Sequence, residues 1–288
     1  MVSNTSGDTF ALSSASTTIP SCAITFTGAY GVSDILYYTP QTLYVINGSY
    51  GNVLTEFLPG ATTPYKTVPI TIASSAIAID NNGNIYTANN IGAGQVYEYT
   101  VGGSQLSITT PGINSPYALA VDKNGTLYVP RTSYSQLLEF PAGATTPSTT
   151  LTLPSISVGG IAVDASGTVY NSVNGTVAKF PVGYTTPTST LTNGLSGPDG
   201  LAFDTNGTLY VVNTGNKTIA EFPSGTTTPS KTLFTSGLTG IRSVAVDASG
   251  TVYVSDASDG EVIEFVGGAT TPSIIITGLI YPGGIAVH

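Results

Sequence analysis

The sequence predicts an all-β protein of the β-propeller class, in which four-stranded sheets form blades around a central channel. One motif recurs along the chain: LAVDKNGTLYV from Leu119 returns as IAVDASGTVYN from Ile161, LAFDTNGTLYV from Leu201 and VAVDASGTVYV from Val244, with a looser copy from Ile77. The copies are spaced 40 to 43 residues apart, which is the length of one blade. Their apolar runs are nearly continuous, which is typical of sheets covered on both faces.

Each repeat is predicted to contain four strands, A to D, in chain order. Strand A is a short apolar run that ends in Asp. The Asp-x-x-Gly-Thr segment after it predicts a hairpin, because Asp opens a turn and Gly accepts a positive φ. Strand B carries a tyrosine that anchors the comparison of the repeats. These tyrosines are Tyr44, Tyr86, Tyr128, Tyr170, Tyr210 and Tyr253.

Strand C ends in a charged residue followed by an aromatic one. The pairs are Glu56-Phe57, Glu98-Tyr99, Glu139-Phe140, Lys179-Phe180, Glu221-Phe222 and Glu264-Phe265. We expect the recurrent glutamates to be solvated charges on an outer face. A turn with Thr-Thr-Pro follows in most repeats. Because proline cannot donate to a strand ladder, strand D is predicted to be the outer edge of each blade.

The middle residue of strand A is an alanine in nearly every repeat. The alanines are Ala78, Ala120, Ala162, Ala202, Ala245 and Ala286. A small residue suits the innermost strand, where wedge-shaped blades converge. Leu36 breaks this pattern in the first repeat.

Seven segments can start a strand A, and they predict seven blades. The last of them, at Ile285, has no strand B after it. Near the N-terminus, residues 7–13 resemble residues 250–255 of strand B, and residues 23–26 resemble the end of a strand C. We therefore expect one domain over residues 1–288: B and C strands of a composite blade in 1–33, six blades in 34–280, and a closing inner strand in 281–288.

The predicted ring is closed by both termini, and 288 residues divided by seven is about 41, close to the repeat length. The alternative is a six-bladed ring in which both terminal segments lie outside the blades. It would leave the strand at Ile285 without a partner, which the hazard of an unpaired strand edge disfavours.

The composition excludes some partners. Only 8% of the residues are charged, the net charge is -9, and the seven Lys and Arg residues do not cluster, which argues against a nucleic-acid partner. No apolar run reaches the ~18 residues of a membrane span, and the N-terminus does not resemble a signal peptide. Cys22 is the only cysteine, so an intrachain disulfide is excluded.

A composition poor in lysine and rich in Ser, Thr, Asn and Gly favours an extracellular or cell-surface location. Asn-x-Ser/Thr sequons point the same way, and they begin at Asn4, Asn47, Asn124, Asn174, Asn206 and Asn216. At Asn124 and Asn206 the Asn-Gly pair is equally explained by the chemistry of a tight turn.

The blades resemble NHL-type repeats, as in LYVVNTGNKTIAEF from Leu209, and also YVTN-type propellers of surface proteins. The resemblance covers essentially the whole chain. It implies a propeller that serves as a binding module, an adhesin or, less often, an enzyme. Similar propellers include calcium-dependent gluconolactonase-like hydrolases and streptogramin lyases.

The residues give little support to catalysis. The only histidine, His288, is the last residue and stands where other repeats carry Asp, which argues against a Ser-His-Asp triad or a histidine-rich metal site. Streptogramin lyases rely on histidine near the start of inner strands, and this chain has none around Asp199 or Pro282. We therefore expect no catalytic residues and no cofactor.

Five aspartates occupy one position in successive repeats: Asp80, Asp122, Asp164, Asp204 and Asp247. They could form a carboxylate ring that binds a cation. Hairpin initiation explains the same spacing, and a single site would need different residues in different blades. We therefore favour the structural role.

Binding residues are expected where the repeats differ, in the loops before strand A and between strands B and C, which share one face of a propeller. Arginine and tyrosine are enriched at binding hot spots, and both occur in these loops. The candidate ligand-binding residues are Asp34, Tyr117, Arg131, Tyr134, Asp199, Arg242, Asp256 and Tyr281.

The favoured function is a non-enzymatic extracellular propeller that binds a protein or carbohydrate ligand or has a structural role at the surface. The alternative is a cation-dependent hydrolase or lyase of the gluconolactonase-like type, with calcium as its cofactor. Self-assembly through an open strand D edge is a third interpretation.

Overall fold

The computed structural model describes residues 41–47, 53–70, 74–89, 94–101, 105–108, 113, 116–156, 158–235 and 237–288, together with the backbone of three N-terminal strands. The chain divides into two units, residues 1–40 and residues 41–288. In the first unit, strands β1 (Val2–Ser3), β2 (Thr9–Ser13) and β3 (Ala23–Thr25) form an antiparallel sheet in that order.

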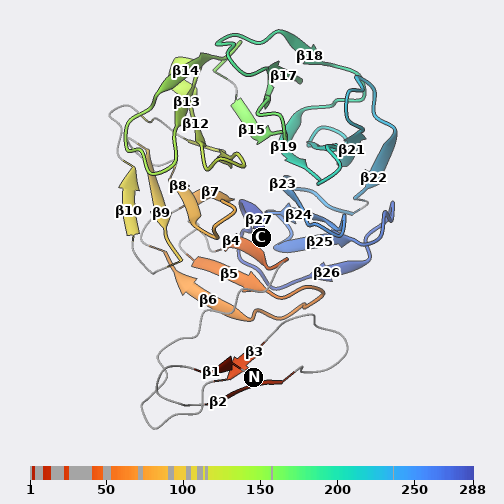
Figure 1. Cartoon of the computed structure of the whole chain (residues 1–288). Helices are drawn as coiled ribbons and strands as arrows, with labels where there is room; N and C mark the ends of the chain where they lie inside the picture. Colours follow the sequence, from red (N-terminus) through yellow and green to blue (C-terminus); the bar gives the residue numbers. More distant parts are fainter. Residues whose placement is uncertain are drawn as a thin grey trace. The chain divides into compact units, whose positions relative to one another are not determined.

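The second unit is a propeller whose described residues form six four-stranded antiparallel blades around a ring (Figure 1). We number the blades in the chain order of their strands B. The inner strands A of blades 1 to 6 are β27 (Ile285–Val287), β7 (Ser74–Ile79), β11 (Ala120–Val121), β15 (Val158–Val163), β19 (Pro198–Phe203) and β23 (Ile241–Val246). The strands B are β4 (Leu43–Asn47), β8 (Ile85–Asn89), β12 (Leu127–Arg131), β16 (Val169–Val173), β20 (Leu209–Asn213) and β24 (Val252–Asp256).

Strands C and D complete each blade toward the outside. The strands C are β5 (Val53–Phe57), β9 (Gln95–Tyr99), β13 (Gln136–Phe140), β17 (Thr176–Phe180), β21 (Thr218–Phe222) and β25 (Glu261–Phe265). The strands D are β6 (Lys66–Pro69), β10 (Gln105–Ile108), β14 (Thr149–Thr152), β18 (Ser189–Leu191), β22 (Lys231–Phe234) and β26 (Ile274–Ile276). A 3-10 helix, η1 (Thr132–Tyr134), lies between β12 and β13.

The blade count corrects the sequence prediction: the ring has six blades, so the seventh, composite blade was wrong. The C-terminal strand does close the ring, but it does so as the inner strand of blade 1. In the pairing of β27 with β4, Ala286 lies opposite Tyr44, as Ala78 lies opposite Tyr86 in blade 2. The C-terminal segment thus meets the requirement for a small residue at this position, whereas Leu36 does not. The segment around Leu36 lies outside the described residues.

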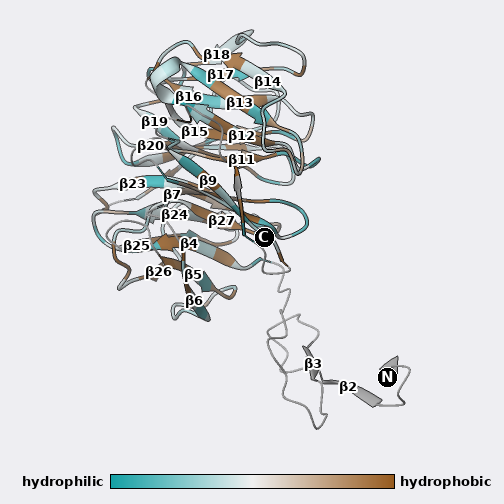
Figure 2. Ribbon diagram, turned by 90° about the vertical axis from the view of Figure 1, so that its left-hand side faces the viewer, coloured by the Kyte–Doolittle hydropathy of each residue, from teal (hydrophilic) through white to brown (hydrophobic). Residues whose placement is uncertain are grey.

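The core lies between neighbouring blades, and hydrophobic residues are concentrated on the strands (Figure 2). Between blades 5 and 6, for example, Val212 and Ile219 pack in one cluster with Val244 and Val252. The aromatic residues that end strand C are fully buried at Phe57, Phe140, Phe180, Phe222 and Phe265. Burial of each such side chain stabilises the folded state by about 1.5–3 kcal/mol. The predicted sheets with two covered faces are confirmed.

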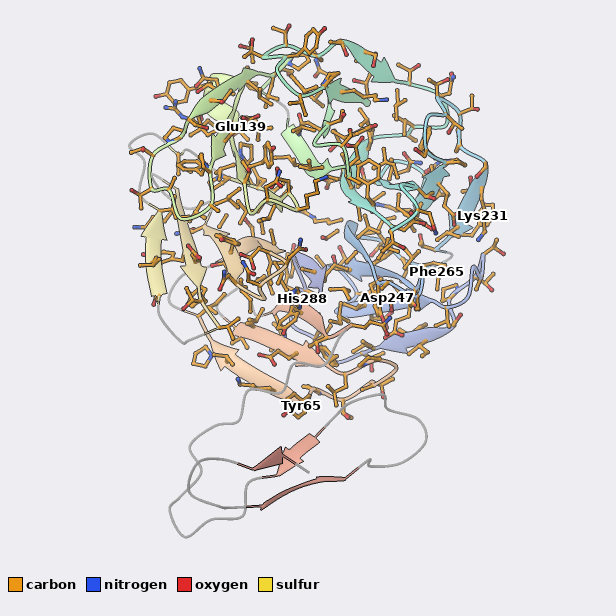
Figure 3. The ribbon with its side chains drawn as sticks, viewed as in Figure 1. Tyr65, Glu139, Lys231, Asp247, Phe265 and His288 are labelled. Carbon is orange, nitrogen blue, oxygen red and sulfur yellow. The ribbon has the colours of Figure 1, made fainter. Side chains whose placement is uncertain are left out.

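Figure 3 places individual side chains in the ring. Tyr65 and Lys231 lie on its outer rim, whereas His288 lies near the inner strands. Among the described residues, no helix is long and apolar enough to cross a membrane.

The Asp-x-x-Gly segments form the predicted hairpins between strands A and B. In blade 4, Asp164 Oδ1 accepts hydrogen bonds from the backbone N–H groups of Ser166 (2.9 Å) and Thr168 (3.0 Å), and Gly167 has φ +88°. The same pair of bonds recurs at Asp80, Asp122, Asp204 and Asp247. Within the described ranges, no group of three His, Cys, Asp or Glu residues could hold a metal ion. The hairpin role of these aspartates is confirmed.

The strand C glutamates differ from expectation, because two of them are buried and Glu56, Glu139 and Glu221 are partly buried. Glu98 and Glu264 are only 8% and 2% exposed. Each lies opposite the tyrosine of strand B, on a sheet face that the neighbouring blade covers. Burial raises the pKa of Glu56, Glu139 and Glu264 above the ordinary value.

Candidate functional site

The inner strands begin at one end of the channel, and most of them begin with an irregularity in their pairing. Register shifts occur near the start of β7, β15, β19 and β23. In each blade the residue three positions before the alanine that lies opposite the strand B tyrosine is at an equivalent place. We call these residues the mouth ring: Ser75, Tyr117, Gly159, Asp199, Arg242 and Gly283.

The next residue along each inner strand is always small, and the structure gives the reason. The residues are Ala76, Ala118, Gly160, Gly200, Ser243 and Gly284. A Cβ atom on Gly160 would lie 2.5 Å from the carbonyl oxygen of Asp199, and one on Gly200 would collide with the carbonyl oxygen of Arg242. The inner strands therefore approach backbone to backbone here. This position is fixed by packing, whereas the mouth ring varies from blade to blade.

Asp199 and Arg242 are neighbours in the mouth ring, in blades 5 and 6. Burial raises the pKa of the Asp199 carboxyl, and the positive charge of Arg242 opposes that shift. A Cβ atom on Gly159 would lie 2.9 Å from Asp199 Oδ1, so the glycine of blade 4 leaves the space in which this carboxylate lies. The buried Ser172 hydroxyl donates to the backbone carbonyl of Asp199 at 2.7 Å and fixes its position.

A second pair lies at the end of strand B of blade 3, where Arg131 ends β12 and Tyr134 ends η1. The guanidinium carbon of Arg131 lies 4.2 Å from the ring centroid of Tyr134, which is cation–π distance. Arg131 Nη1 also donates to Gln136 Oε1 at 3.0 Å. Tyr134 is 54% exposed. The pair therefore presents an aromatic ring and a positive charge in a fixed arrangement.

The other candidates have different surroundings. Tyr117, in the mouth ring, and Tyr281, just before it, are exposed. Asp256 is fully buried and accepts hydrogen bonds from the backbone N–H groups of Thr239, Gly240, Ser258 and Asp259, so it holds two loops together. Asp34 lies outside the described residues.

The structure brings some candidates together and separates others. Asp199 and Arg242 come from adjacent blades. Arg131 and Arg242 come from blades 3 and 6, which lie on opposite sides of a six-membered ring. One ligand could contact both arginines only if it spanned the channel mouth.

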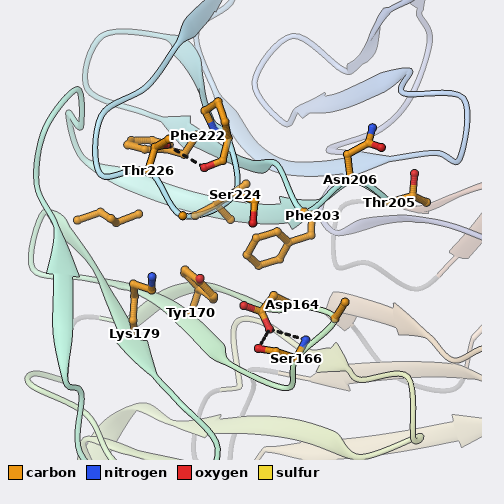
Figure 4. A pocket seen from close by; sticks show the side chains of 16 residues that line it. Asp164, Ser166, Tyr170, Lys179, Phe203, Thr205, Asn206, Phe222, Ser224 and Thr226 are labelled. Atoms are coloured by element: carbon orange, nitrogen blue, oxygen red, sulfur yellow. Dashed lines mark hydrogen bonds between the residues drawn. The ribbon is translucent and has the colours of Figure 1, made fainter.

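Sequence reasoning missed a pocket at the opposite end of the ring, among the Asp-x-x-Gly hairpins. This pocket has a volume of about 340 Å³ and lies between blades 4 and 5 (Figure 4). Its lining includes Asp164, Tyr170, Lys179, Phe203 and Ser224. The signal was present in the sequence, because Lys179 stands where the other five blades carry Glu.

The sequence matches no protein-family model and no curated protein. Solved structures are similar in fold. A chain of a nidogen/laminin complex is 16% identical, with 86% of this chain and 98% of that chain covered and a TM-score of 0.70. A streptogramin B lyase is 12% identical, with 85% and 91% covered and a TM-score of 0.62. A catalytically inactive histidine-to-alanine variant of virginiamycin B lyase from Staphylococcus aureus, with quinupristin, is 11% identical, with 85% and 86% covered and a TM-score of 0.59. These likenesses and the six closed blades identify the chain as a β-propeller.

Proposed function

We propose that this propeller is a non-enzymatic binding module that holds a protein partner at its channel mouth. The mouth ring is the observation that carries the proposal. In blades that are otherwise near copies, this one position holds an aspartate, an arginine and a half-exposed tyrosine among smaller residues. A position that differs in every neighbouring blade is suited to recognition.

The chemistry of the mouth favours a protein partner. Arginine and tyrosine are enriched at the hot spots of protein interfaces. Tyr117, Tyr134 and Tyr281 are all at least half exposed there, and Arg131 is already held against Tyr134. The similar nidogen/laminin structure is itself a complex of proteins. The composition described above also supports an extracellular or cell-surface location.

A lyase function has less support from the residues. The inactive variant of virginiamycin B lyase lacks a histidine. None of the six mouth ring positions of this chain is a histidine. His288 follows β27, at the end remote from Gly283, where its backbone pairs with Thr42. The one imidazole is thus placed away from the mouth.

A peptide-display selection against the purified propeller tests the proposal. The selected peptides should bind the Tyr117→Ser/Arg242→Ser variant at least tenfold more weakly than the wild type, because two mouth contacts are lost. The matched control is Tyr65→Ser/Lys66→Ser, which removes an exposed tyrosine and a lysine from the outer rim of blade 1. Peptides that respond to the rim variant and not to the mouth variant would contradict the proposal.

A further inference from the structure

The pocket between blades 4 and 5 lies away from the mouth ring and has its own chemistry. Its walls are the hairpin of blade 4, with Asp164 and Ser166, the side chains of Lys179 and Phe203, and two turns of blade 5 that carry Asn206 and Ser224 (Figure 4). Its volume of about 340 Å³ is at the lower end of the range for small-molecule sites.

Lys179 places a positive charge in this pocket, where the other five blades carry a glutamate. In blades 1 and 5 the strand C glutamate pairs with the lysine opposite it on strand D, Glu56 with Lys66 at 4.0 Å and Glu221 with Lys231 at 3.3 Å. Lys179 instead lies opposite Ser189. Among the described residues it makes no ion pair, and its Nζ lies 5.0 Å from the ring centroid of Tyr170. A carboxylate would complement the charge of Lys179.

The carboxylate in the pocket, Asp164, makes no ion pair with Lys179, and its hydrogen bonds hold the hairpin. Asp164 Oδ1 accepts from the backbone N–H and the hydroxyl of Ser166 and from the backbone N–H of Thr168. The negative charge of Asp164 disfavours a small anion alone in the same pocket. Asp164 favours a ligand that carries hydroxyl groups in addition to its negative charge, since a hydroxyl can donate to a carboxylate oxygen.

Other groups in the pocket are available to such a ligand. The side chains of Ser224 and Asn206 make no hydrogen bond to any described residue. Phe203 supplies an apolar wall where the other blades have Ile or Val, and its ring meets that of Tyr170 edge to face at a centroid distance of 4.9 Å. Lys179 and Phe203 are thus two departures from the repeat at one interface.

We propose that this pocket binds a hydroxylated carboxylate of the size of one acidic sugar unit. Lys179 receives the carboxylate, Ser224, Asn206 and Asp164 bond the hydroxyl groups, and Phe203 covers an apolar face of the ring. A uronic acid has all three features. Glucose lacks the charge, and acetate lacks the hydroxyl groups.

Calorimetric titration with glucuronate, glucose and acetate tests the assignment. Glucuronate should bind the wild type at least tenfold more tightly than either of the other two. The Lys179→Glu variant installs the residue of the other five blades, so it suits the fold, and it should bind glucuronate at least tenfold more weakly. The matched control Lys66→Gln, which removes a lysine from blade 1, should bind as the wild type does.

Three results would overturn the proposal: no glucuronate binding by the wild type at tens of millimolar, equal binding by Lys179→Glu, or acetate binding as tight as that of glucuronate. A second measurement needs no variant. In the wild type, glucuronate should shift the NMR resonances of the Phe203 and Tyr170 rings, and shifts confined to other residues would place the ligand elsewhere.

Discussion

Glu264 illustrates how a repeated residue takes different properties from its surroundings. It is 2% exposed and lies opposite Tyr253 on the neighbouring strand. The hydroxyl of Tyr253 donates a hydrogen bond to Asp247, the hairpin aspartate of the same blade. Burial, together with the negative charge of Asp247, raises the pKa of Glu264 to about 7. Its carboxyl group therefore keeps a proton in the folded chain at a pH where the unfolded chain has lost it.

This shift predicts a pH dependence of stability. Between the ordinary pKa of 4.5 and about 7, the folded state binds more protons than the unfolded state, so the contribution of Glu264 to the free energy of unfolding falls as pH rises. The slope is at most about 1.4 kcal/mol per pH unit. Urea unfolding from pH 4 to 8 should show Glu264→Gln becoming more stable relative to the wild type with rising pH. The matched comparison is Glu261→Gln, which removes a carboxyl group from the same strand. A constant difference for Glu264→Gln would contradict the prediction.

The Asp199 and Arg242 pair gives a second prediction for single residues. Because the charge of Arg242 lowers the pKa of Asp199 against the effect of burial, Arg242→Ala should raise that pKa further. Arg131→Ala is the control, since blade 3 lies across the ring from blade 6. NMR titration of the Asp199 carboxyl carbon measures both. An unchanged pKa in Arg242→Ala would mean that the two side chains do not interact.

At the scale of elements, local chemistry made the strands predictable from the sequence. The way in which the ring closes was not predictable from it. The Asp-x-x-Gly turn, the tyrosine and the strand D proline each act within a few residues, so they locate strands in every repeat. The inner strand of blade 1 depends instead on two segments more than 240 residues apart that can both start a strand A. Ala286 and Leu36 distinguish them, because an alanine lies opposite the strand B tyrosine in all six described blades.

The candidate site was predictable to a similar extent. The variable loops directed attention to Asp199 and Arg242, which the fold makes neighbours. The burial of Asp256 and the pocket at Lys179 depend on contacts between segments distant in sequence. The repeats align the mouth ring positions, but the close approach of the inner strands beside them is visible only in the structure.

The role of β27 as an inner strand predicts the effect of removing it. Deleting residues 281–288 should lower the melting temperature markedly, because blade 1 loses its inner strand and the buried side chain of Ile285. Burial of that side chain alone contributes about 1.5–3 kcal/mol. A milder variant, Ile285→Ala, should lower the free energy of unfolding by about 2–5 kcal/mol. A melting curve unchanged by the deletion would show that β27 does not close the ring.

For the whole molecule, the six-membered ring turns the separation of Arg131 and Arg242 into a prediction about ligand size. The two residues belong to opposite blades, so a partner that contacts both must span the mouth. Each single change to Ala should then weaken binding of a mouth-directed peptide. Because residues far apart act independently, the losses should add to within about 0.5 kcal/mol in the double variant.

The double variant, Arg131→Ala/Arg242→Ala, should weaken binding by a hot-spot-sized ~2 kcal/mol or more, which is about thirtyfold. Its melting curve should stay close to that of the wild type, because neither arginine belongs to the apolar clusters between the blades. Fluorescence titration of a labelled peptide measures the affinities, and calorimetry measures the melting. If only one arginine affects affinity, the partner occupies one side of the mouth and does not span it. If neither does, with folding intact, the arginines are ordinary loop residues and recognition lies elsewhere on the propeller.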